Sequence, residues 1–89
     1  MNIEITPDHG SLYLYEEENV ILKRFPVLMI EDEWILFADE KESRMEILAA
    51  RVTFDAQGRI AEFDRHVDRE QWHRLHGLWR EYEKTHRRN

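Results

Sequence analysis

Apolar and polar residues alternate in short runs along the first two thirds of the chain, and turn-forming residues separate the runs. A period of two is typical of β-strands that bury one face. The runs cover residues 2–6, 11–15, 20–23, 27–30, 34–38, 44–54 and 59–64. The pattern predicts an antiparallel meander of about six short strands between residues 2 and 66, forming a curved sheet or a small barrel-like sheet.

Three features of these runs refine the prediction. Pro26 cannot donate to a sheet ladder, so the apolar run 20–30 is expected to break there, at a bend or an edge. Runs 27–30 and 34–38 are apolar at every position, which predicts the most buried strands, covered on both faces. Run 44–54 changes phase near its middle, and a β-bulge at residues 48–50 would reconcile the two phases.

The best-defined turn lies between residues 54 and 60. Asp55 is suited to open a type I turn, and Gly58 can supply the positive φ of a bulge residue. This segment predicts a β-hairpin that ends in the last strand.

The helical period appears only near the C-terminus, where a helix is predicted over residues 68–86. Asp68 is a good N-cap, Gln71 is placed to return the bond, and Val67 and Trp72 can pack around the cap as a hydrophobic staple. One stripe contains Trp72, Leu75, Trp79, Tyr82 and His86, with Leu78 at its margin. We expect its aromatic side chains to cover the sheet, so the chain is predicted to be a single α+β domain.

Composition narrows the functional classes. Because the chain has no cysteine, it can form neither a disulfide scaffold nor a thiolate zinc site. Neither a signal peptide nor an apolar run of about 20 residues is visible, and from this we expect a cytoplasmic protein.

Few residues are arranged for catalysis. No serine or threonine lies in a nucleophile motif, and the three glycines are isolated, so no phosphate-binding loop can form. His66, His73 and His76 are better explained as exposed histidines than as metal ligands, because no second motif completes a site. We therefore predict neither an enzyme nor a bound cofactor.

Charge is segregated along the chain. Residues 1–64 contain 15 Asp and Glu against 6 Lys and Arg, a balance of −9, whereas residues 65–89 contain 4 against 7, a balance of +3. Beside the aromatic stripe, the helix is predicted to carry a cationic stripe. Its residues are Arg69, His73, His76, Arg80, Lys84 and Arg87. We predict that this cationic stripe binds a partner.

These observations favour a small protein-interaction or regulatory module that uses the cationic stripe or a sheet edge, and its partner is either another protein or a second copy of this chain. A nucleic-acid or anionic-surface binder using the same stripe is the alternative. A third hypothesis is a ligand pocket or small enzyme inside the curved sheet, with His66 or tyrosines at its mouth.

Overall fold

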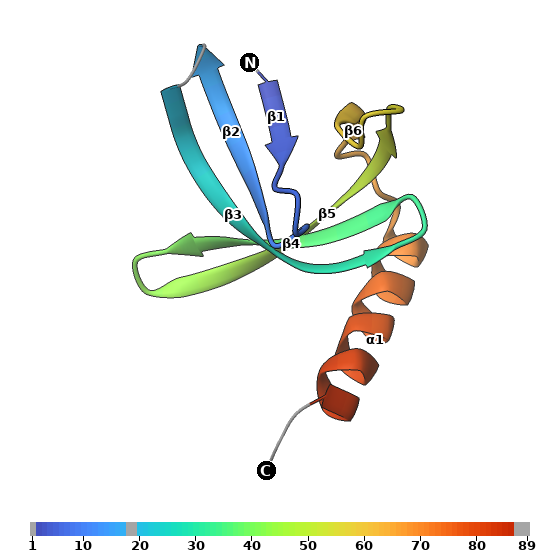
Figure 1. The fold of residues 1–89 in the computed structure, drawn as a ribbon. Coiled ribbons are helices and arrows are strands. Elements are labelled where there is room, and N and C mark those ends of the chain that lie inside the picture. The colour runs from blue at the N-terminus through green and yellow to red at the C-terminus, as the bar shows by residue number, and fades with distance from the viewer. Residues whose placement is uncertain (1, 18–19, 87–89) are drawn as a thin grey trace.

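A computed structural model describes residues 2–17 and 20–86, without the side chain of His86, and shows six antiparallel strands followed by one helix (Figure 1). The elements are β1 (Asn2–Ile5), β2 (Ser11–Glu17), β3 (Val20–Glu31), β4 (Trp34–Lys41), β5 (Arg44–Phe54), β6 (Ile60–Asp64) and α1 (Arg69–His86). The predicted α+β architecture is confirmed.

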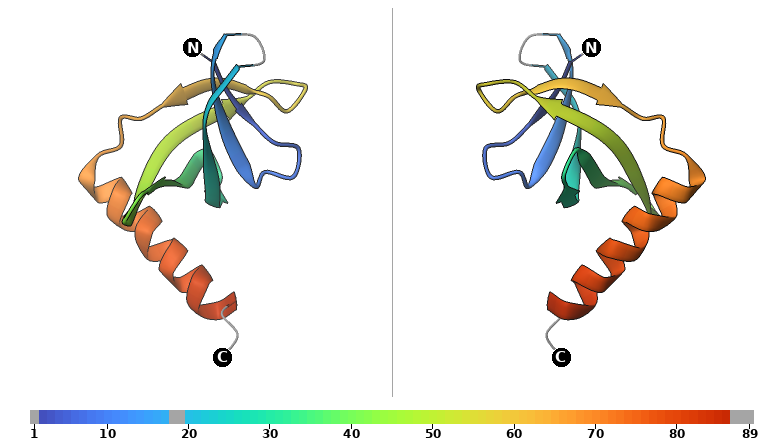
Figure 2. Two further views of the ribbon diagram at one scale, coloured as in Figure 1. Left: turned by 90° about the vertical axis from the view of Figure 1, so that its left-hand side faces the viewer. Right: turned by 90° about the vertical axis from the view of Figure 1, so that its right-hand side faces the viewer.

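Each strand pairs with the next one along the chain, so the sheet has the order β1-β2-β3-β4-β5-β6. The sheet curls until β1 and β6 come close, and it forms a nearly closed barrel whose seam lies between these two edge strands. The helix leaves β6 and runs along the outside of the barrel (Figure 2).

Strand β3 continues through Pro26, so the predicted break there is wrong, although the strand is strongly curved (Figure 1). Up to Pro26, β3 pairs with β2, and from Val27 onward it pairs with β4. Proline is tolerated at this position because the strand exchanges one partner for another there.

Two apolar clusters lie on opposite faces of the sheet. Inside the barrel, the fully buried residues are Leu12, Ile35, Phe37, Ala50 and Val52. On the outside, Leu36 and Ala49 pack against Leu75 of α1, with Trp72 and Trp79 half-buried around them. The prediction that the helix covers the sheet with its indoles is confirmed, whereas Tyr82, which was expected to join them, is 51% exposed.

Coverage of both faces of the sheet explains the change of phase in β5. Pairing between β4 and β5 runs without a register shift from Trp34↔Arg51 to Lys41↔Arg44, so the bulge predicted at residues 48–50 is absent. Ala50 belongs to the inner cluster and Ala49 to the outer one. Apolar residues therefore occupy both phases because both faces of this strand are covered.

The β5–β6 hairpin has the predicted turn. Asp55 Oδ1 accepts hydrogen bonds from the backbone amides of Gln57 and Arg59, both at 2.9 Å, and Gly58 has a φ of 81°. This left-handed backbone conformation is strained for any residue with a Cβ atom.

Alanine substitutions at Gly58 and Gly77 are expected to change stability in opposite directions. A Cβ atom at either position meets nothing within 4 Å, so the backbone conformation alone determines how alanine changes the stability. Gly58→Ala should lower the free energy of unfolding by about 1 kcal/mol because of its positive φ, whereas Gly77→Ala should raise it by about 1 kcal/mol within α1. Urea denaturation of both variants tests this, and shifts of the same sign would contradict it.

The helix begins as predicted, with Asp68 Oδ1 accepting from the backbone amide of Gln71 at 2.7 Å. The Gln71 side chain is turned toward Trp34 and Arg74, so the prediction that it returns the bond to the cap is wrong. With its carbonyl oxygen facing these donors, it accepts from Trp34 Nε1 at 3.3 Å and from Arg74 Nη2 at 2.7 Å. The contact with Trp34 of β4 ties the first turn of α1 to the sheet, whereas the contact with Arg74 lies within the helix. Within the described residues, no helix is long and apolar enough to cross a bilayer.

Candidate functional site: a groove along the free edge of β3

The residues of the predicted cationic stripe differ in how exposed they are. Arg69, His73, Arg80 and Lys84 are exposed on α1, and Arg87 lies outside the described residues. His76 is half-buried, with its ring centroid 5.5 Å from that of Trp72 and 5.9 Å from that of Trp79. The imidazole is thus a packing partner of the indoles, and partner binding by the exposed stripe residues stays a prediction.

A second feature of the surface lies on strand β3. The sequence predicted residues 27–30 to be among the most buried, yet they are only half-buried. The reason is the exchange of partners at Pro26. Beyond Val27, whose amide donates to the Gly10 carbonyl at 3.0 Å, β3 is paired with β4 alone among the described residues. The stretch Leu28 to Glu31 is therefore a free strand edge.

A groove of about 490 Å³ follows this edge. It is lined by His9, Val27, Leu28, Met29, Ile30, Glu31, Leu78 and Tyr82. Successive side chains of a strand point to opposite faces. Because five consecutive residues of β3 line the groove, it must run along the backbone edge of the strand.

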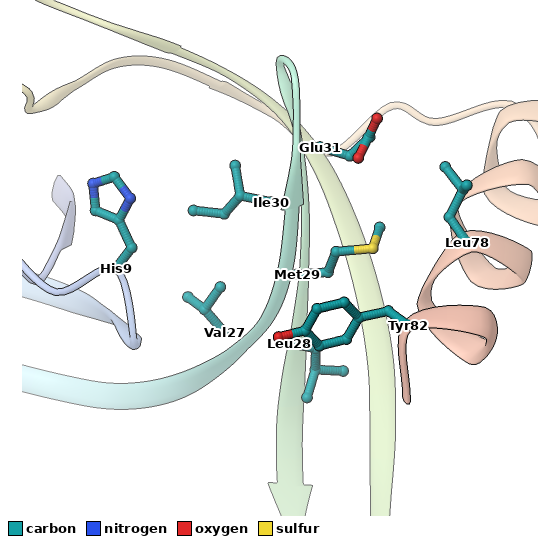
Figure 3. Close-up of a pocket in the computed structure, with 8 residues that line it drawn as sticks. All are labelled: His9, Val27, Leu28, Met29, Ile30, Glu31, Leu78 and Tyr82. Atoms are coloured by element: carbon teal, nitrogen blue, oxygen red, sulfur yellow. The ribbon is translucent and has the colours of Figure 1, made fainter. Parts of the chain in front are cut away.

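Figure 3 shows the two sides of this groove. His9, Val27 and Ile30 lie on one side of β3, and Met29, Leu78 and Tyr82 lie on the other, where α1 passes. Leu78 is 37% exposed and Tyr82 is 51% exposed, so the groove leaves apolar surface open on its helical side. The site thus combines open apolar side chains with a free backbone edge.

The wall opposite the helix is the β1–β2 turn, whose geometry fixes His9. His9 has a φ of 59°, and its amide donates to the Thr6 carbonyl at 2.9 Å. The Asp8 carboxylate accepts from Thr6 Oγ1 at 2.6 Å and from the Gly10 amide at 2.9 Å, and these bonds hold its pKa below the ordinary value. The His9 ring stacks on Phe54, with centroids 5.9 Å apart.

Among the described residues that line the groove, Glu31 is the only acidic or basic residue besides His9. It is half-buried, and its carboxylate has no ion pair within the described part of the chain. A partly desolvated carboxylate favours a cation as its neighbour. The groove is therefore suited to an apolar segment that also carries a basic side chain.

The groove and the cationic stripe lie on different sides of α1. At about 100° per residue, Leu78 and Arg80 point roughly 200° apart around the helix axis. Sequence reasoning noticed the stripe because its spacing is local, and it missed the groove, which depends on how distant strands pair. The available signals were Leu78 at the margin of the aromatic stripe and the apolar run after Pro26.

No cluster of three or more His, Cys, Asp or Glu side chains suited to hold a metal occurs in residues 2–17 and 20–86. Comparisons with protein-family models, with curated proteins and with solved structures gave no significant match. The function must therefore be inferred from the geometry of this chain.

Proposed function

We propose that this protein is an interaction module that binds an extended segment of a partner protein by adding it as a strand to the free edge of β3. The observation that carries the proposal is a groove lined by five consecutive strand residues. Such an edge offers unpaired backbone donors and acceptors, and these give affinity to an added strand.

Apolar side chains of the bound segment supply the specificity. In an added strand, alternate side chains point toward the same face. Side chains on the face of α1 would contact Met29, Leu78 and Tyr82, while those on the other face would lie near His9 and Val27. A basic side chain near Glu31 would complete the fit, and the acidic balance of residues 1–64 would speed the approach of such a segment.

The walls favour a single extended segment over the sheet edge of a second folded copy. A folded sheet carries neighbouring strands and covering side chains beside its edge strand. The β1–β2 turn flanks the groove on one side and α1 flanks it on the other, so we expect these walls to obstruct the strands beside the edge of a second copy. A homodimer formed through this groove is therefore an outcome that would contradict the proposal.

Selection from a random-peptide phage library, followed by fluorescence anisotropy with a recovered peptide, tests the function. Leu78→Gln should weaken binding about tenfold or more, because it places a polar side chain in the apolar wall. Met45→Gln is the matched control, since Met45 is 50% exposed on β5 and does not line the groove. The Met45→Gln variant should bind the peptide with the same affinity as the unchanged protein.

The recovered peptides should carry apolar residues at every second position together with a basic residue. Replacing that basic residue by glutamate should also lower affinity. Recovery of no peptide, or equal losses in Leu78→Gln and Met45→Gln, would contradict the proposal. Peptides that lose affinity only when Arg80 and Lys84 are reversed to glutamate would assign the interaction to the cationic stripe instead.

A further inference from the structure

A second cavity, of about 390 Å³, opens inside the barrel. It is lined by Asn2, Ile3, Leu14, Phe25, Phe37, Phe63 and Arg65. Five of the six strands contribute to this lining, so the cavity is the mouth of the barrel itself. It lies at the end where β1 begins, at the top of Figure 1. Its volume falls within the usual range of small-molecule sites.

Three phenylalanine rings form the apolar wall of this cavity. The centroid of Phe37 lies 5.5 Å from that of Phe25 and 5.8 Å from that of Phe63. Because Phe37 is only 1% exposed, its packing fixes the floor of the cavity. The rings therefore form a preformed surface for the apolar part of a small ligand.

Among the described residues of the lining, only Arg65 at the rim is charged, and its charge is positive. The guanidinium of Arg65 lies over the Phe37 ring, with its Cζ atom 5.6 Å from the ring centroid. Among the described residues that line the cavity there is no carboxylate, and Arg65 forms no ion pair with any other described residue. In a chain with 19 Asp and Glu, a cationic rim with no carboxylate in its described lining points to an anionic ligand.

The carboxylate of Asp64, the residue before Arg65, contacts His66. Asp64 Oδ1 accepts from the His66 backbone amide at 2.8 Å and lies 3.0 Å from His66 Nδ1. These contacts, the backbone bond first, hold the pKa of the Asp64 carboxyl below its ordinary value. His66 therefore orders the chain beside Arg65, whereas the sequence had suggested His66 itself for the mouth of a pocket.

From this combination we infer that the barrel mouth binds a small amphipathic carboxylate, whose apolar body packs on the phenylalanines and whose carboxylate pairs with Arg65. The Asn2 amide at the rim can donate to the same carboxylate. This site is separate from the β3 groove and does not depend on the proposed function.

Two-dimensional NMR titration with octanoate and with octanol tests this inference. Both probes have the same apolar chain, and only octanoate is charged. Octanoate should bind about tenfold more tightly than octanol, and both should shift the amide signals of Phe25, Phe37 and Phe63. Arg65→Gln should remove the difference while leaving octanol binding unchanged.

Arg59→Gln is the matched control, because Arg59 is exposed on the β5–β6 hairpin and does not line this cavity. It should keep the preference for octanoate. Equal binding of octanoate and octanol, a preference that survives Arg65→Gln, or shifts confined to other residues would each overturn the inference. Failure of peptide binding at β3 would leave it unaffected.

Discussion

Replacement of Leu75 by alanine is expected to lower the free energy of unfolding by about 3 kcal/mol, within the usual range for a leucine deleted from a core. Leu75 is 0% exposed and, among the described residues of α1, it is the only fully buried one. It packs against Leu36 and Ala49 on the outer face of the sheet. Alanine would leave a cavity at the centre of the contact that holds the helix on the barrel.

Urea denaturation followed by circular dichroism measures this effect, with Leu78→Ala as the control. Leu78 lies one turn further along α1 and is 37% exposed, so its truncation should cost about 1 kcal/mol or less. A loss below 1 kcal/mol for Leu75→Ala would show that the helix is not anchored as described.

Phe37→Ala is expected to have the largest effect on stability, a loss of about 4 kcal/mol. The Phe37 ring is 1% exposed at the centre of the inner cluster and contacts the rings of Phe25 and Phe63. Its removal deletes buried apolar volume and two aromatic contacts together, so the cost exceeds that of an aliphatic truncation.

Phe54→Ala provides the comparison for this variant. Phe54 is 37% exposed and stacks on His9 at the end of β5. Its truncation should therefore cost about 1 kcal/mol. Equal midpoints of chemical denaturation for the two variants would contradict the assignment of Phe37 to the core.

Local signals in the sequence were sufficient for several elements. The N-cap at Asp68 and the turn at Asp55 and Gly58 depend on residues only a few positions apart, and both are present as predicted. The helical stripe was also correct around Leu75, because a helix that covers a sheet must bury one face.

Predictions that depend on distant pairing were less accurate. Pro26 was interpreted as a strand break because a proline lacks an amide hydrogen, yet β3 changes partner there and needs no break. Apolar residues in both phases of β5 were interpreted as a bulge, although they result from coverage on both faces. A single sequence contains no direct record of which strand edges remain unpaired.

The candidate site illustrates the same limit. Cationic residues at helical spacing were visible in the sequence, and four of them are exposed on α1. The groove, in contrast, is built from a turn, a strand edge and a helix that lie far apart in the sequence. Its apolar residues resemble those of any core until the fold leaves them half-buried.

Hydrogen exchange at the backbone amides of Leu28 to Glu31 tests the central claim most directly. In the presence of a selected peptide, exchange within this stretch should slow, because an added strand accepts from its free edge. The β4–β5 ladder, which is already paired from Trp34 to Lys41, should exchange as before. Unchanged exchange along β3, with new protection on α1 alone, would contradict strand addition at this edge.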